Sequence, residues 1–434
     1  MPATTPHTPQ PARRRILFLT PQLPYPPEQG AALRNYSLIC QVAQHHAVSL
    51  LTFAPDSQGP ASSSPLQELC QIVRTVPPPE RTSGDRLRTL ALTRLPDMAR
   101  RLQSAPFTQA LRDLVTREPF DVIQVEGIEM APDGTLVRQW LGERFPAKTE
   151  AGREQGAESR SPALVFDDHN AEYVLQQRAC LADARRPARW PAALYSLVQW
   201  RRLARFERRF CRDADVVVAV SGADARALQR LDPSLDPLVV PNGVDTGRYH
   251  PDLPDTLPLR HPAVVFTGKM DYRPNVDAML WFHRRVWPRV LAAITDAHLY
   301  IVGKSPHPRL APLRGDPSVT ITGWVPDVLP YLAGADVVVA PMRTGGGTQL
   351  KVLEAMAAGR PLVTTTFGAE GVGLTPGQHA LVEDDPARQA QAIGRLLADR
   401  AAARALATAG RRLVVERYDW SVVAARLEDV YASL

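Results

Sequence analysis

Short apolar runs of strand length alternate along this chain with stretches of helical periodicity, and no other feature constrains its fold as strongly. The run RRRILFLT (13–20) predicts a buried parallel strand, and AVSLLTF (47–53) predicts a second one. The stretch AALRNYSLICQVAQHH (31–46) between them has the periodicity of a helix. Strand, helix, strand is a βαβ unit, which builds a parallel sheet. Further strands are predicted in this half at residues 121–126, 163–169 and 215–221.

The pattern begins again in the second half of the chain. PLVVPNGVD (237–245) predicts a strand that leads into a turn, and more strands are predicted at 263–268, 297–303, 319–323, 336–341 and 361–365. Helices are predicted from about Val276, at 327–335 and at 348–358. The expected fold class is therefore α/β, with two Rossmann-like doubly wound domains. Loops at the carboxyl ends of the strands would line a cleft between these domains, which is a natural ligand site.

The domain organisation follows from these two series of strands. We expect a flexible N-terminus at 1–12, a first domain at 13–240, a second at 241–415 and a closing helix at 416–434. Two polar segments rich in small residues, 56–65 and 147–162, fit no element and are predicted to be mobile loops.

Composition places the chain among globular proteins of the cytoplasm. Of its 434 residues, 44% are hydrophobic and 22% are charged, which is typical of a protein with a packed core. No apolar run approaches the ~20 residues that cross a bilayer, and Pro21 cuts the first apolar run too short for a signal peptide. The four cysteines are far apart and form no C-x-x-C pair, so neither disulfides nor a zinc site is expected.

Positive charge is concentrated in one segment. Arg178–Arg212 contains ten arginines and two acidic residues, an excess of eight positive charges in a chain whose net charge is +6. Trp190, Tyr195 and Trp200 lie in the same segment. Arginines mixed with interfacial aromatic residues could contact an anionic membrane surface. A solvated, arginine-rich helix pair is the alternative interpretation. Nucleic acid is not expected, because no nucleic-acid-binding motif accompanies the charge.

The segment MRTGGGTQLKVLE (342–354) is the strongest candidate for a binding site. It follows a predicted strand and leads into a predicted helix, so its glycine amides and the helix N-terminus can approach an anion. Lys351 can add a full positive charge, and Glu354 lies one turn later, where it can accept hydrogen bonds from hydroxyls. Phosphate beside sugar hydroxyls describes a nucleotide or a nucleotide-sugar. A glycine-rich turn with a surface Lys–Glu pair is the alternative. The segment matches neither a Walker A motif nor a dinucleotide fingerprint.

Several motifs in the same order give the chain a family resemblance. In the C-terminal half these are VVPNGVDTGRYHP, VVFTGKMDYRPN, VTITGWVPDVLPYLAGADVVVAP and LKVLEAMAAGRPLVTT. In the N-terminal half they are TPQLPYPPEQGAALRNYSL, FDDHNAEY and FERRFCRDADVVVAVS. The chain resembles the retaining glycosyltransferases of family 4, which have the two-domain GT-B fold. It looks most like the sugar transferases of bacterial exopolysaccharide clusters, and the likeness covers nearly the whole chain except the two polar segments.

This resemblance implies roles for residues of the second domain. Glu354 matches the carboxylate that holds the ribose hydroxyls of the donor. Gly268 and Lys269 match positions at the donor diphosphate. Lys269, Lys351 and the glycine loop are the groups expected to stabilise the leaving nucleoside diphosphate. No metal or other cofactor is expected, because GT-B enzymes generally work without one.

The resemblance also implies roles for four residues outside that cluster. Gly30 matches the glycine that lets the diphosphate lie close to the first domain, and His169 matches the histidine that lines the sugar pocket. A structural role is the alternative for His169. Trp324 and Val325 match the loop that borders the nucleobase.

Two positions depart from the family pattern. The family usually has a glutamate eight residues before Glu354, where this chain has Gly346, and a second basic residue where this chain has Pro274. Arg273 or Lys351 can supply the missing charge. The expected contacts to the donor sugar are then the main-chain amides of Gly345, Gly346, Gly347 and Thr348.

Other polar residues have simpler explanations. Asn275 and Asp277 are interpreted as residues that cap a helix. Arg34 is interpreted as a surface arginine, and contact with an acceptor phosphate is the alternative. The letters DAD (213–215) imitate a D-x-D metal motif but precede a strand, so we interpret them as the entry to that strand.

The leading hypothesis is a glycosyltransferase that moves a hexosyl group, with retention, to a saccharide or lipid-linked acceptor at the cytoplasmic membrane face. One alternative is a GT-B nucleotide-sugar 2-epimerase, which shares the donor pocket but needs no acceptor. The other is a non-catalytic protein that binds a nucleotide-sugar, suggested by Gly346 in place of the usual glutamate.

Overall fold

The chain divides into two compact units. The computed structural model describes residues 13–28, 30–55, 64–82, 84–85, 92–144, 161–184, 187–254, 257–344 and 347–434. Unit 1 comprises Met1–Ala219, Asp224–Val240 and Ala424–Leu434, and unit 2 comprises Val220–Ala223 and Pro241–Val423. Among the described residues, no helix is both long and apolar enough to cross a membrane. The N-terminus at 1–12 and almost all of the two polar segments lie outside the described residues, so their predicted mobility stays a prediction.

Unit 1 is built on a parallel sheet of seven strands in the order β3-β2-β1-β4-β5-β6-β7. The strands are β1 Arg15–Thr20, β2 Ala47–Phe53, β3 Ile72–Val76, β4 Val122–Glu126, β5 Ala163–Asp168, β6 Val216–Ala219 and β7 Leu238–Val239. The central strands are buried on both faces, which is why they appear in the sequence as continuous apolar runs and not as alternating ones.

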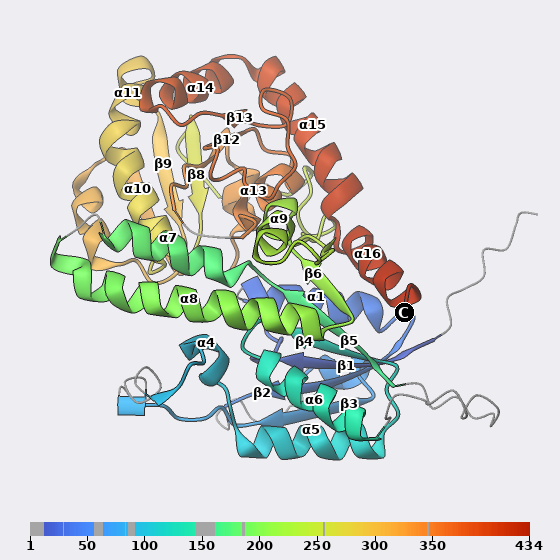
Figure 1. The fold of residues 1–434 in the computed structure, drawn as a ribbon. Coiled ribbons are helices and arrows are strands. Elements are labelled where there is room, and N and C mark those ends of the chain that lie inside the picture. The colour runs from blue at the N-terminus through green and yellow to red at the C-terminus, as the bar shows by residue number, and fades with distance from the viewer. Residues whose placement is uncertain are drawn as a thin grey trace, which may run out of the picture. The chain divides into compact units, whose positions relative to one another are not determined.

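Helices cover this sheet (Figure 1). Those of unit 1 are α1 Gly30–Val42, α2 Leu66–Leu69, α4 Asp97–Arg100, α5 Ala105–Arg117, α6 Ala131–Arg144, α7 Glu172–Ala184, α8 Trp190–Asp213 and α9 Gly222–Leu231, with the 3₁₀ turn η4 Pro187–Arg189. Helices α5 and α6 pack against strands β2 to β5. Helices α7 and α8 form a long antiparallel hairpin. The last helix, α16 Trp420–Ala432, contributes its residues from Ala424 onward to this unit.

Unit 2 has a second parallel sheet of six strands in the order β10-β9-β8-β11-β12-β13. The strands are β8 Ala263–Thr267, β9 His298–Val302, β10 Val319–Gly323, β11 Val337–Ala340, β12 Leu362–Thr364 and β13 Leu381–Val382. Its helices are α10 Arg273–Arg285, α11 Trp287–Ala293, α12 Leu329–Ala333, α13 Leu350–Ala357, α14 Pro386–Ala398 and α15 Arg400–Tyr418, with the 3₁₀ segment η5 Pro308–Gly315.

In both units, an aspartate that precedes one strand accepts a hydrogen bond from the main chain of the neighbouring strand. Asp121 accepts the main-chain N–H of Arg15 (2.8 Å), and Asp215 accepts that of Leu164 (2.8 Å). Asp336 does the same for Ala263 at 2.7 Å in unit 2. Asp215 belongs to the DAD letters, so the interpretation of that segment as a strand entry is confirmed.

The α/β class and the two doubly wound sheets are confirmed, but some elements were missed or misplaced. Helix α10 begins at Arg273, three residues before the predicted start, because Pro274 suits the first turn of a helix. The edge strands β3 and β13 were not predicted. Strand β13 has two residues, too few to show any periodicity.

Candidate functional site

The carboxyl ends of strands β8, β9 and β11, which are neighbours in the sheet of unit 2, carry a compact group of chemically active residues. Two glycines allow the backbone segments after β8 and β9 to approach each other closely. Gly303 has φ +154°, and a Cβ on it would lie 1.8 Å from the carbonyl oxygen of Gly268. Gly268 has φ +156°, and a Cβ on it would lie 2.8 Å from Asn275 Nδ2 and 3.4 Å from Lys351 Cε. The predicted site residue Gly268 therefore lies against Lys351, while Gly303 was missed.

Lys351 lies in the first turn of α13, as predicted. Its Nζ donates to Asn275 Oδ1 at 3.1 Å and lies 5.5 Å from the centre of the Phe266 ring. Burial lowers its pKa from 10.5 to about 8, although the charge of Glu354 raises it in part. The amino group is thus held at the strand ends by an amide and an aromatic face, where it can meet an anion.

Asn275 corrects the capping interpretation. It is buried inside the first turn of α10, where its amide donates to the carbonyl of Lys269 (2.8 Å) and its oxygen accepts from Lys351. The helix has no side-chain cap. Asp277 faces Arg273 at 3.6 Å and Arg309 at 2.8 Å, so it is an ion-pair residue and not a cap either.

Glu354 is half-buried on the same helix as Lys351. Burial raises its pKa, while the charge of Lys351 and a hydrogen bond from the Tyr249 hydroxyl lower it in part. Burial and the neighbouring carboxylate raise the pKa of Tyr249 in turn. Glu354 is therefore an acceptor already oriented by one hydroxyl. Tyr249 was missed as its partner, since it is about a hundred residues away in sequence.

The remaining predicted residues of unit 2 have varied surroundings. Lys269 is exposed beside Asp271 (3.6 Å), and Gly347 has φ +66°. Thr348 is buried, and its hydroxyl lacks a hydrogen-bond partner among the described residues. Gly345 and Gly346 lie outside the described residues.

The predicted nucleobase loop begins at the carboxyl end of edge strand β10. Trp324 is 69% exposed, whereas Val325 packs against the apolar core of unit 2. These neighbours therefore have different environments, and only the indole is open to a ligand.

A cavity of about 840 Å³ lies at the carboxyl ends of β11, β12 and β13, still within unit 2. Its walls include Met342 and Arg343 at the start of the glycine segment, with Thr366 and Glu370 after β12. The guanidinium of Arg343 lies 4.9 Å from the centre of the Trp281 ring. A hollow of this size can hold a sugar-sized ligand beside the glycine segment.

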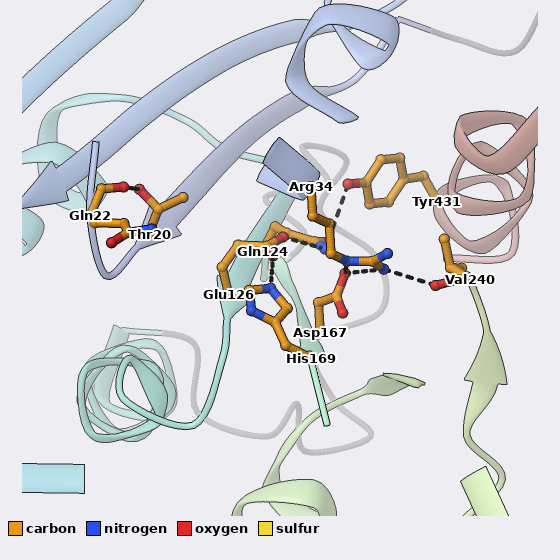
Figure 2. A network of polar contacts seen from close by, with 9 residues as sticks. All are labelled: Thr20, Gln22, Arg34, Gln124, Glu126, Asp167, His169, Val240 and Tyr431. Carbon is orange, nitrogen blue, oxygen red and sulfur yellow. Dashed lines mark hydrogen bonds and ion pairs between the residues drawn. The ribbon is translucent and has the colours of Figure 1, made fainter. Parts of the chain in front are cut away.

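In unit 1, His169 lies at the carboxyl end of β5 and belongs to a buried polar network (Figure 2). Its Nε2 lies 2.7 Å from Glu126 Oε2. Burial alone lowers the pKa of His169, but the hydrogen bond to Glu126 and the charges of Glu126 and Asp167 raise it above its ordinary value. The raised pKa favours the protonated form of His169 more than in a free imidazole, and that form can donate a hydrogen bond or supply positive charge.

Arg34 corrects a second interpretation, because it is a core residue and not a surface arginine. Only 1% of it is exposed, and its Nη2 lies 2.7 Å from Asp167 Oδ2 and 2.9 Å from the carbonyl oxygen of Val240. Figure 2 shows the guanidinium between these two acceptors. Burial raises the pKa of Asp167, and the charge of Arg34 partly offsets this.

The network reaches the end of the chain through Gln124. The Tyr431 hydroxyl donates to Gln124 Oε1 at 3.1 Å, and Gln124 Nε2 donates to Glu126 Oε1 at 3.0 Å. Among the described residues, Glu126, Asp167 and His169 are close enough to one another to hold a metal ion. Arg34 donates to Asp167 Oδ2, and Gln124 and His169 contact the two oxygens of Glu126, whereas the buried Oδ1 of Asp167 has no hydrogen-bond partner among the described residues.

A second acidic pair lies directly behind His169. Asp168 and Glu207 are buried side by side, and burial together with their mutual interaction raises the pKa of Asp168 well above its ordinary value. Glu207 accepts the main-chain N–H groups of Glu172 (2.8 Å) and Tyr173 (3.1 Å). A side chain of α8 therefore caps the first turn of α7.

Gly30 is the least constrained of the predicted site residues. It is exposed, it begins α1, and a Cβ on it would meet no atom of the described residues within 4 Å. No steric need for glycine arises there from the chain itself.

Sequence comparison connects these residues with glycosyltransferases. Residues 261–399 match the family model described as "Glycosyl transferases group 1", and residues 151–248 match "Glycosyltransferase Family 4". The two matched ranges include His169 in unit 1 and Lys269, Lys351 and Glu354 in unit 2.

Two curated relatives are mycobacterial mannosyltransferases. The GDP-mannose-dependent alpha-(1-6)-phosphatidylinositol monomannoside mannosyltransferase of Mycobacterium tuberculosis is 33% identical over 245 residues, which are 51% of this chain and 63% of that protein. The phosphatidyl-myo-inositol mannosyltransferase of Mycolicibacterium smegmatis is 32% identical over 208 residues, or 46% of this chain and 52% of that one. The chain thus spans between about half and 63% of the length of these relatives.

Solved structures match over nearly the full chain. Sucrose-phosphate synthase from Thermosynechococcus elongatus has a TM-score of 0.71 at 19% identity, covering 97% of this chain and 99% of that one. Anabaena Alr3699/HepE in complex with UDP and glucose has a TM-score of 0.61 at 16% identity, covering 97% and 100%. The chain therefore has the two-sheet α/β fold of these GT-B proteins, with segments in both units that match glycosyltransferase family models.

Proposed function

We propose that this protein is a retaining glycosyltransferase that moves a hexosyl group from a nucleotide-sugar to a saccharide or lipid-linked acceptor. The observation that carries the proposal is the meeting of Gly268, Asn275 and Lys351 at the strand ends of unit 2, with Glu354 one turn along α13. Bare backbone, an oriented cation and a half-buried carboxylate acceptor are the groups that a diphosphate joined to a ribose needs.

Each group has a definite task in this proposal. Lys351 and Lys269 stabilise the negative charge that develops on the leaving diphosphate, assisted by main-chain amides of the glycine segment. The free oxygen of Glu354 accepts hydrogen bonds from the ribose hydroxyls. His169 donates a hydrogen bond to the transferred sugar or to the acceptor. The lysines supply the positive charge that a divalent metal supplies in other transferases, so the reaction is proposed to need no cofactor.

The relatives suggest which donor to test first. The Mycobacterium tuberculosis relative is named for GDP-mannose and for a phosphatidylinositol monomannoside, which is a lipid-linked saccharide. We therefore propose GDP-mannose as the donor and a lipid-linked saccharide as the acceptor, at the inner face of the cell membrane. The exopolysaccharide acceptor that the sequence suggested stays a prediction.

The decisive experiment measures donor binding and turnover in Glu354→Gln. Thermal-shift titrations with GDP, UDP and their sugars identify the donor, since a ligand that binds the folded state raises its melting temperature. Loss of a charged acceptor of ribose hydroxyls should weaken donor binding by about 10- to 100-fold. The matched control is Glu416→Gln, which changes an exposed glutamate of α15 in the same unit. Wild-type turnover in Glu354→Gln would refute the site.

The same assays separate the two alternative functions. A sugar epimerised in the absence of any acceptor would indicate a 2-epimerase. Tight nucleotide binding without transfer or hydrolysis, across donors and acceptors, would indicate a binding protein.

A further inference from the structure

The turn end of the α7–α8 hairpin exposes large apolar side chains. Leu181 is 56% exposed, Trp190 61%, Leu194 64% and Tyr195 37%. We call these four residues the hairpin tip. In Figure 1 the hairpin runs across the view, with the C-terminal end of α7 and the N-terminal end of α8 at the left.

The hairpin tip is ordered, and its exposure is not a by-product of loose packing. Cys180 Sγ lies 3.3 Å from the carbonyl oxygen of Ala193, which joins the two helices just behind the tip. The indole N–H of Trp190 donates to the carbonyl of Ala184 at 3.2 Å. The opposite side of α8 is the buried one, through Ala193, Ser196, Gln199 and Leu203. Helix α8 therefore packs on the core through one side, and the apolar residues of the hairpin tip lie outside that buried side.

The apolar residues continue into positive charge along one face of α8. Trp190, Leu194, Arg201 and Arg205 are spaced by four, seven and four residues, which places them in one row on a helix. Among the described residues, Arg201 and Arg205 are exposed and have no ion-pair partner. Arginines at both ends of the segment differ, because Arg189 pairs with Asp183, and Arg208 and Arg212 both pair with Asp232.

We propose that the hairpin tip docks onto an anionic lipid bilayer, with its apolar side chains in the headgroup–acyl boundary and Arg201 and Arg205 against lipid phosphates. Trp and Tyr favour this boundary because their rings are apolar with one polar edge, and arginines beside it are attracted by anionic headgroups. The inference uses no residue of the proposed donor site, so it does not depend on the reaction.

A bilayer fits these observations better than a protein partner. A stable protein interface buries about 800 Å² on each side and 20 to 30 residues, far more than four side chains at the end of a hairpin provide. Binding to a bilayer requires only a few inserted apolar side chains together with nearby cations. The order along α8, apolar first and arginine behind, also follows the order of an anionic leaflet from its acyl boundary outward.

The test is co-sedimentation of the full chain with vesicles of phosphatidylcholine alone or with one-third phosphatidylglycerol. Wild type should bind the anionic vesicles, and more weakly as salt rises. Leu181→Gln/Leu194→Gln should weaken binding at least tenfold at every salt concentration. Arg201→Gln/Arg205→Gln should weaken binding by roughly 30-fold at low salt and much less at high salt.

Two control variants carry matched changes elsewhere. Val415→Gln replaces an exposed apolar residue of α15, and Arg284→Gln/Arg285→Gln removes two exposed arginines of α10. Both should bind vesicles as wild type does. All hairpin variants change exposed side chains, so their melting temperatures and their turnover with a soluble acceptor should be unchanged. Vesicle binding that is absent in wild type, or retained in Leu181→Gln/Leu194→Gln, overturns the proposal. So does a concentration-dependent dimer that this variant abolishes, because the tip would then bind a second copy.

Discussion

Arg34 is 1% exposed, and its guanidinium forms an ion pair with the buried carboxylate of Asp167. Arg34→Met should lower the free energy of unfolding by about 3–5 kcal/mol, because Asp167 is then left buried without its partner. Urea unfolding measures this loss. Arg15→Met is the matched control, since the pair of Arg15 with Asp121 (3.3 Å) is exposed and should be worth less than about 1 kcal/mol. Equal losses in both variants would contradict a core role for Arg34.

Lys351 should make donor binding depend on pH. Its pKa of about 8 lies below the ordinary value, so the free protein loses this positive charge as the pH rises through 8. Affinity for a nucleoside diphosphate should therefore fall between pH 7 and 9.5, as measured by calorimetric titration. Lys351→Arg keeps its charge and should bind with a flat pH profile. A midpoint near 8 that persists in Lys351→Met would assign the titration to another group.

At this scale the sequence predicted types of residue better than their partners. Lys351 and Glu354 were predicted because they follow a glycine-rich loop in the sequence, and His169 because it lies at the end of a predicted strand. Tyr249, Asn275 and Gln124 did not, since each acts through a contact with a residue distant in sequence. Arg34 was misjudged for the same reason, because its acceptor Asp167 lies 133 residues away.

At the scale of elements, the close approach of the backbones that follow the parallel strands β8 and β9 leaves no room for a methyl group on Gly303. Gly303→Ala would place Cβ 1.8 Å from the carbonyl oxygen of Gly268, so the two strand ends must separate. The variant should lose about 2–4 kcal/mol of stability and should bind the donor more weakly. Unfolding curves and donor titrations measure the two effects.

Gly315→Ala is the control for Gly303→Ala, because a Cβ on residue 315 meets no atom of the described residues within 4 Å. It should behave as wild type in both measurements. A Gly303→Ala variant that also does so would show that the backbone relaxes freely at this edge of the sheet.

Elements were predictable where burial on both faces leaves a continuous apolar run, as in β1, β2 and β9. Strand β3 escaped prediction because it is an edge strand whose middle residues, Arg74 among them, are exposed. The start of α10 lies three residues before the predicted one, and its first turn contains Pro274, a position at which a helix accepts proline.

For the molecule as a whole, several buried groups make stability depend on pH in the same direction. Burial raises the pKa of Glu172 to about 8 and that of Asp133 to about 7, and it also raises those of Asp168 and Glu207. The folded state keeps these protons where the unfolded state has released them. Stability is then lost as the pH rises towards the folded pKa values. His169 adds to this loss, because its raised pKa stabilises the fold below 6.5 and ceases to do so above the folded value.

The melting temperature should therefore fall by on the order of 5 °C between pH 6.5 and 8.5. Groups with lowered pKa values act in the opposite direction, but His46 and His298 do so only below 6.5 and Lys351 only as the pH approaches and exceeds about 8. Glu207→Gln keeps an acceptor for the N–H groups at the start of α7 but cannot titrate, so its slope should be shallower. Scanning calorimetry across this range checks both slopes. A melting temperature that rises with pH would contradict the buried protons.

Unit 1 is discontinuous in sequence, and this has a consequence for how the protein is made. Tyr431 follows Gln124 by 307 residues, so a ribosome translates all of unit 2 before it supplies the hydroxyl that completes the Gln124–Glu126–His169 chain. Until Tyr431 has been synthesised, unit 1 lacks the hydroxyl that donates to Gln124 Oε1. A nascent chain halted within unit 2 can assemble the sheet of unit 1 but not its finished polar centre.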